Sequence, residues 1–209
     1  MSATPADGTP PPEARAPGIP GVPAVAQVPL VNIANILTVT RLMLVPVFLF
    51  TLFPGDGLST GWRMVAFLVF AVGSITDFVD GHLARKYGLV TDFGKVIDPI
   101  ADKALTGAAL VGLSVLGELP WWITLTIAGR EILVTLLRFW VIRYGVIAAS
   151  YGGKVKTFAQ IIAIGLYLLP LPAAFDPVLW AAMGIALVLT VVTGMDYVVR
   201  AVRLRAARG

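Results

Sequence analysis

The chain has 209 residues, of which 13% are charged, and its mean hydropathy is +0.86. A soluble domain carries roughly 25% charged residues, so this composition indicates a polytopic membrane protein with one domain. There is no cysteine and only one histidine, His82, which excludes disulfides, thiolate metal sites and multi-histidine metal sites. Any metal would be held mainly by oxygen, which suits Mg²⁺ or Mn²⁺. We expect no nucleic-acid partner.

Residues 1–27 are rich in Pro, Ala and Gly, and they predict a disordered cytoplasmic tail and no signal peptide. Residues 31–36 are compatible with a short interfacial helix. Six apolar segments follow, each interpreted as a membrane-spanning helix: 36–53, 62–80, 97–116, 119–138, 158–171 and 178–199. Breaks are expected at 54–57, 117–118 and 172–177. The predicted fold is therefore all-α, with a six-helix domain over 28–200 and a basic C-terminal tail over 201–209.

The charges in the predicted loops fall into two groups. One group is basic and comprises Arg85, Lys86, Lys95, Arg143, Lys154, Lys156, Arg200, Arg203, Arg205 and Arg208. The other contains Asp56, Glu118 and Asp176, with Arg63 as the nearby cation. The positive-inside rule places the basic loops, and with six spans both termini, in the cytoplasm.

Four aspartates lie inside or at the ends of the predicted spans. Asp77 and Asp80 are three residues apart, and Asp98 and Asp102 are four apart, so each pair shares a helix face. A short loop joins the two helices, so the four carboxylates are expected to converge at the cytoplasmic side. Such a cluster requires protonation or bound cations. A pair of divalent metals, as used in phosphoryl displacement, fits that charge.

Two other interpretations of these aspartates remain open. The acids can form ion pairs that merely stabilise the bundle or mark its topology. They can also serve as ion relays in a proton or cation transporter. Transporters more often have helices broken near the bilayer midplane, whereas these acids are expected near one face.

The same stretch resembles a known family. Residues Asp77-Phe-Val-Asp80-Gly81-His-Leu-Ala84-Arg85, followed after eight residues by Gly94-Lys-Val-Ile-Asp98-Pro-Ile-Ala-Asp102, match the defining pattern of the CDP-alcohol phosphotransferases. The resemblance covers about 31–199. Further stretches are similar to the phosphatidylglycerophosphate synthase subgroup: Asn35-Ile-Leu-Thr38 with Arg41, Gly129-Arg-Glu-Ile-Leu-Val-Thr135 with Arg138, and Gly153-Lys-Val-Lys-Thr157.

The resemblance implies a reaction and a site. A phosphatidyl group would pass from CDP-diacylglycerol to glycerol 3-phosphate, giving phosphatidylglycerol phosphate and CMP, with two divalent ions, Mg²⁺ or Mn²⁺. Asp77, Asp80, Asp98 and Asp102 would bind metal, and Asp102 would also be the general base. The CDP moiety would contact Asp77, Asp80, Gly81, Ala84, Arg85, Gly94, Asn35 and Thr38. The family also implies a homodimer in the bacterial cytoplasmic membrane, with the active site facing the cytoplasm.

The chemistry of these residues agrees with the implied roles. Gly81 and Ala84 keep one helix face small, and the guanidinium of Arg85 suits phosphate oxygens. A base beside metal ions is expected to be weak, so Asp102 would depend on the positioning of the attacking hydroxyl.

The acceptor phosphate needs cations of its own, and the candidates are Arg130, Arg138, Lys154, Lys156 and Arg41. Lys154 and Lys156 are expected at the open cytoplasmic mouth of the fifth helix. Arg130 lies within an apolar span, and Glu131 is not an automatic partner because adjacent side chains point apart. The aspartate pattern handles the donor, so acceptors such as inositol phosphate, serine or phosphatidylglycerol remain alternatives.

Overall fold

The computed structural model describes residues 33–87, 92–141 and 151–206. These residues form helices only, so the all-α prediction is confirmed for this part of the chain. The elements are α1 (Ile33–Leu52), α2 (Thr60–Tyr87), α3 (Asp92–Val115), α4 (Trp121–Val141), α5 (Tyr151–Leu168), the 3₁₀ helix η1 (Ala173–Phe175) and α6 (Asp176–Ala206).

The helix ends follow the proline and glycine signals, with several corrections. α5 begins at Tyr151 and ends at Leu168, whereas the predicted segment was 158–171, because Pro170 cannot continue the helix. α6 begins at Asp176, so Pro177 belongs to its first turn, where the missing N–H of proline costs nothing.

Residues 33–36 are the first turn of α1 and form no separate interfacial helix, since no helix breaker follows them. α6 continues to Ala206, so 201–206 extend the helix beyond the expected domain boundary. Residues 1–32 and 207–209 lie outside the described residues.

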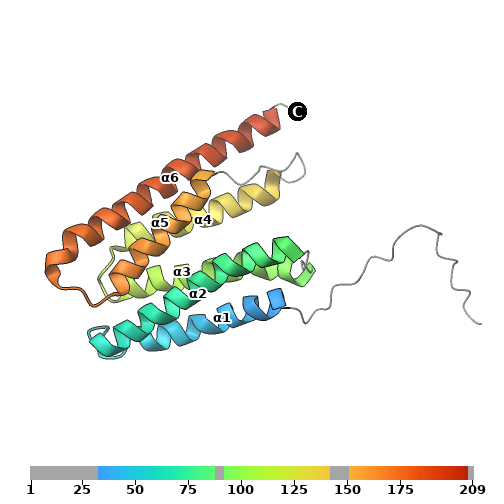
Figure 1. The fold of residues 1–209 in the computed structure, drawn as a ribbon. Coiled ribbons are helices and arrows are strands. Elements are labelled where there is room, and N and C mark those ends of the chain that lie inside the picture. The colour runs from blue at the N-terminus through green and yellow to red at the C-terminus, as the bar shows by residue number, and fades with distance from the viewer. Residues whose placement is uncertain (1–32, 88–91, 142–150, 207–209) are drawn as a thin grey trace, which may run out of the picture.

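The six helices form two groups of three (Figure 1). α1 packs along both α2 and α3, and α6 packs along both α4 and α5. The two groups meet through contacts of α2 with α5, and of α3 with α4 and α5. α2 and α3 run in opposite directions in Figure 1, as the short connection between them predicts.

One end of the bundle is closed by two tight turns and a buried ion pair. Gly57 and Gly117 have φ of 74° and 76°, a conformation that glycine adopts without steric cost. A Cβ on Gly57 would lie 2.7 Å from the Leu116 side chain, so the turns touch. The buried Arg63 donates to both carboxylate oxygens of Glu118, at 2.5 and 2.8 Å, and to the backbone carbonyl of Tyr167. This end therefore joins α2, the α3–α4 turn and α5.

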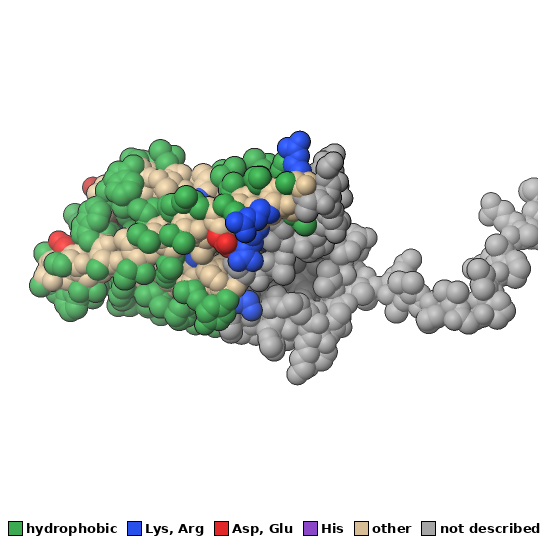
Figure 2. Space-filling view, turned by 90° about the horizontal axis from the view of Figure 1, so that it is seen from above, with side chains coloured by type: hydrophobic (Ala, Val, Ile, Leu, Met, Phe, Trp, Pro, Cys, Tyr) green, Lys and Arg blue, Asp and Glu red, His purple; other side chains and the backbone are tan. Residues whose placement is uncertain are grey.

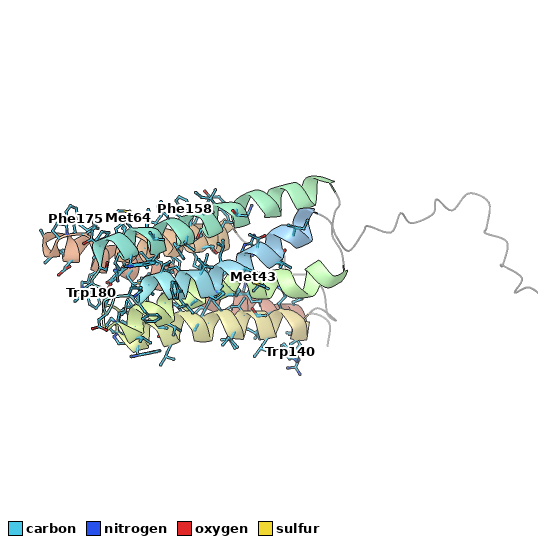
Figure 3. All side chains as sticks on the ribbon, turned by 90° about the horizontal axis from the view of Figure 1, so that it is seen from below. Met43, Met64, Trp140, Phe158, Phe175 and Trp180 are labelled. Atoms are coloured by element: carbon cyan, nitrogen blue, oxygen red, sulfur yellow. The ribbon has the colours of Figure 1, made fainter. Side chains whose placement is uncertain are left out.

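Large apolar side chains cover much of the outer surface (Figure 2). The six labelled in Figure 3 are exposed and come from α1, α2, α4, α5, η1 and α6: Met43, Met64, Trp140, Phe158, Phe175 and Trp180. Exposed apolar surface of this extent is typical of contact with protein or lipid. Within the described residues, one stretch, 173–206, is both long and apolar enough to cross a membrane, and three shorter apolar helical stretches accompany it.

Candidate functional site

The four aspartates of the family pattern lie on the two antiparallel helices. Asp77 and Asp80 belong to the last third of α2, and Asp98 and Asp102 to the first half of α3. Their spacing is therefore helical, as predicted. Their side chains lie outside the described part of the structure, so their convergence on one site stays a prediction. The same holds for Asn35, Gly81, Ala84, Arg85 and Gly94.

A cleft of about 40 Å³ lies one helical turn from both aspartate pairs. Ser74 is three residues before Asp77, and Thr106 is four residues after Asp102. Five helices contribute to the lining, which comprises Arg41, Gly73, Ser74, Lys103, Leu105, Thr106, Glu131, Lys156, Thr157, Gln160 and Ile161. The cleft therefore opens where the two groups of helices meet.

The Glu131 carboxylate is the centre of the polar network in this cleft. Lys103 of α3 donates to its Oε2 at 2.5 Å, and Lys156 of α5 donates to its Oε1. Arg130 donates to the same Oε1 at 2.9 Å. Three positive charges thus meet at this one carboxylate.

Arg130 pairs with Glu131, the neighbour that the sequence did not make an automatic partner. Their Cβ atoms do point apart, but the arginine side chain is long enough to bring its guanidinium back to the carboxylate. The Nη2 atom of the same guanidinium donates to the Thr193 hydroxyl of α6 at 3.0 Å. A Cβ on Gly194 would lie 2.9 Å from Arg130 Cγ, so only glycine leaves room for the arginine at this point. The Nε atom of Arg130 is buried and has no hydrogen-bond partner among the described residues.

The structure separates the five predicted acceptor cations. Lys156 and Arg41 are buried, at 4% and 5% exposure, and both line the cleft. Burial of Lys156 corrects its expected place at an open mouth, since Glu131 draws the ammonium inward. Arg130 reaches the same network through Glu131. Lys154 and Arg138 are exposed and do not line the cleft, so their predicted role has no contact to support it.

Sequence reasoning assigned no site role to several polar residues of the cleft, among them Lys103, Glu131 and Gln160. Lys103 follows Asp102 directly in an apolar stretch, and Gln160 lies four residues after Lys156 on the same face of α5. A polar side chain at this spacing within an apolar helix was the available signal. Thr38 is buried one turn before Arg41.

The cleft is suited to an anion that also carries polar uncharged groups. Its cations come from α1, α3 and α5, and the hydroxyls of Ser74 and Thr106 stand beside them. Lys and Arg gather toward one end of the face in Figure 2, while two acidic patches mark the other end. The asymmetry agrees with the charge sorting that the sequence predicted.

The described acidic side chains do not form a metal site. Within 33–87, 92–141 and 151–206, no group of three or more His, Cys, Asp or Glu side chains with described positions can hold a metal ion. The described network around Glu131 is instead neutralised by protein cations. The predicted metal site therefore depends on the aspartates of α2 and α3.

Comparison with known proteins identifies the family. The family model described as CDP-alcohol phosphatidyltransferase matches residues 31–192. The chain belongs to the CDP-alcohol phosphatidyltransferase family. Its members are transferases, and the predicted resemblance is confirmed.

Several relatives within the family are similar over most of the chain. A Mycobacterium tuberculosis H37Rv protein named probable phosphatidylglycerophosphate synthase is 56% identical over 167 residues, 80% of each chain. CDP-diacylglycerol–glycerol-3-phosphate 3-phosphatidyltransferases from Bacillus subtilis and Rickettsia bellii are 38% and 39% identical. Each of these two matches covers 77% of this chain and 90% of the relative.

The Glu131 network predicts that loss of its carboxylate strongly destabilises the fold. We expect Glu131→Gln to lower the free energy of unfolding by about 3 kcal/mol, because the substitution leaves buried cations without their carboxylate. The midpoint of thermal unfolding of the detergent-solubilised protein measures this. Asp196→Asn is the matched control, since it breaks an exposed pair with Arg200 and is expected to cost less than about 1 kcal/mol. Equal midpoints for the two variants would contradict the central role of Glu131.

Proposed function

We propose that this chain transfers the phosphatidyl group of CDP-diacylglycerol to glycerol 3-phosphate, releasing CMP. The observation that carries the proposal is the position of the cationic cleft, one helical turn from the family's aspartates on α2 and α3. A donor site and an acceptor site are thereby adjacent. The relatives named above carry the names of a probable phosphatidylglycerophosphate synthase and of glycerol-3-phosphate 3-phosphatidyltransferases.

The donor side of the reaction belongs to α2 and α3. Gly81 and Ala84 would leave room for the cytidine beside α2, and Arg85 would bind phosphate oxygens. The primary hydroxyl oxygen of the acceptor attacks the phosphorus that carries diacylglycerol. The bond from that phosphorus to CMP breaks, and the hydroxyl proton passes to the Asp102 carboxylate. Holding both substrates in line is the main contribution of the chain.

Two divalent ions, Mg²⁺ or Mn²⁺, are part of the proposal. Asp77, Asp80, Asp98 and Asp102 offer carboxylate oxygens, the donor type that these ions prefer. When bound, the ions would neutralise the pyrophosphate and the charge that develops on departing CMP. Four adjacent carboxylates without cations would repel one another strongly.

The acceptor phosphate is assigned to the cleft. Lys103, Arg130 and Lys156 converge on one carboxylate, and their N–H groups are donors of the kind that a phosphate dianion accepts from. Arg41 of α1 lines the same cleft. Such a cluster of cationic donors suits a phosphorylated alcohol better than an acceptor without phosphate, such as serine.

We further propose that the six helices cross the bacterial cytoplasmic membrane with the cleft at the cytoplasmic side. The exposed apolar side chains around the bundle and the basic residues at one end support this arrangement. The family resemblance adds a homodimer. Residues 1–27 remain a predicted cytoplasmic tail.

The direct test is CMP release from CDP-diacylglycerol by the purified full-length chain in detergent with Mg²⁺. We expect CMP with glycerol 3-phosphate and little with serine, inositol phosphate or phosphatidylglycerol, because the cleft cations select a small phosphorylated acceptor. Chelation with EDTA should abolish release, and added Mg²⁺ should restore it. Absence of CMP with every acceptor would reject the transferase activity and favour a transporter. Release with inositol phosphate alone would reject the acceptor.

The aspartates provide a second prediction. Asp98→Asn and Asp102→Asn should each lower turnover by more than about 100-fold, the scale of a lost general base or metal ligand. Membrane insertion should be unchanged, as checked by the yield of folded protein after size-exclusion chromatography. Asp196→Asn, an exposed aspartate on α6, is the control and should keep turnover within about twofold. Near wild-type turnover in either site variant would contradict the assignment.

Lys156 provides a third prediction, on acceptor affinity. Lys156→Gln should raise KM for glycerol 3-phosphate by about tenfold, since a charge-assisted hydrogen bond contributes about 1.5 kcal/mol. KM for CDP-diacylglycerol should hardly change. Arg203→Gln removes an exposed cation of α6 and controls for the change in net charge. An equal rise in both KM values would mean that Lys156 supports the fold rather than the acceptor.

A further inference from the structure

Gln160 is the polar side chain of the cleft that the proposed function has not used. It lies on α5, it is 5% exposed, and it lines the cleft together with Lys156. Its Oε1 atom is buried and accepts no hydrogen bond from any described residue. Gln160 thus lines the cleft and carries a buried acceptor that has no partner among the described residues.

An unpartnered amide oxygen is costly in a folded protein. Most buried polar side-chain atoms have a hydrogen-bond partner, and an unsatisfied group loses its hydration without compensation. The hydroxyls of Ser74 and Thr106 line the same cleft, yet neither supplies the missing bond. A bound molecule that donates a hydrogen bond to the Gln160 oxygen would satisfy it and remove this cost.

The charge of the cleft limits what that donor is. The ammonium and guanidinium groups of the cleft all donate, and they suit the oxygens of a phosphate. An amide oxygen cannot bond to a phosphate oxygen that carries no proton, because both are acceptors. It requires an O–H or N–H of the ligand. A ligand that suits both the cations and Gln160 has an anionic group beside an O–H or N–H donor, and in a phosphorylated alcohol that donor is a hydroxyl.

The spacing on α5 fits such a molecule. Lys156 and Gln160 are four residues apart, so their side chains lie one above the other on one face, about 6 Å along the axis. With the phosphate of a three-carbon phosphorylated alcohol near Lys156, the middle carbon and its hydroxyl are at a distance that suits Gln160. The primary hydroxyl at the far end is then free to meet the donor.

We propose that Gln160 is a specificity-determining residue whose Oε1 accepts a hydrogen bond from the secondary hydroxyl of the acceptor. The inference rests on the proposed function. It adds a residue that recognises the secondary hydroxyl of the acceptor, which the cations cannot distinguish. A site built to bond a substrate hydroxyl discriminates against the analogue that lacks it, since the protein group is then left unpaired.

The test compares two acceptors in the CMP-release assay. Glycerol 3-phosphate has the secondary hydroxyl, and 3-hydroxypropyl phosphate lacks it but keeps the phosphate and the attacking hydroxyl. The wild type should prefer glycerol 3-phosphate by about tenfold in kcat/KM, the scale of one net hydrogen bond. Gln160→Leu should lower kcat/KM about tenfold for glycerol 3-phosphate and about twofold or less for the analogue. The preference should therefore disappear.

Gln160→Met is the second variant. Its apolar side chain is longer than leucine and fills the space of glutamine if Gln160→Leu leaves a void. Either variant should unfold at a temperature no lower than the wild type, because the unpaired amide is removed. An equal loss of kcat/KM with both acceptors would show a structural or phosphate-binding role and overturn the inference. An unchanged preference in both variants, or none in the wild type, would overturn it as well. In each of these outcomes the wild type still releases CMP, so the proposed function stands. No CMP from the wild type with either acceptor would overturn both.

Discussion

The arrangement of the cleft depends on one carboxylate that holds three cations together. Glu131 of α4 receives hydrogen bonds from Lys103, Lys156 and Arg130, and Arg130 in turn bonds to Thr193. Four helices, α3 to α6, are joined by this single network. Without Glu131 the cations would repel one another and would have no reason to share one buried place. The same carboxylate thereby gathers the cationic donors to which the acceptor phosphate is assigned in the proposed function.

Two polar networks of the bundle use similar residues in different ways. At one end, Arg63 donates to the two oxygens of Glu118 and to a backbone carbonyl, beside the turns around Gly57 and Gly117. In the cleft, three cations converge on Glu131, and the Oε1 atom of Gln160 has no hydrogen-bond partner among the described residues. The first network is satisfied and rigid, whereas the second leaves a buried acceptor unsatisfied. The exposed apolar side chains around the bundle fit the hydrocarbon of a bilayer.

Much of the fold was predictable from local signals. Apolar length and the Pro and Gly breaks located six helices, and their ends differ mainly where polar sequence continues a helix, as in α2 to Tyr87 and α6 to Ala206. Hydropathy cannot detect such extensions, because a helix that leaves an apolar environment keeps its hydrogen bonds while its side chains become polar. Pro177 marked a break from sequence but is part of α6, since the first turn of a helix tolerates proline.

The sequence by itself determined the family and predicted the residues of the donor chemistry, because the aspartate pattern and its spacing are local in the chain. Only the tertiary structure decided which cations face one another. Lys103, Glu131 and Lys156 lie on three helices, and their meeting depends on how α3, α4 and α5 pack. Lys154 and Lys156 are two residues apart and look alike in sequence, yet one is exposed and the other is buried against Glu131. Positions two apart point to different sides of a helix, and packing alone determines which side faces the cleft.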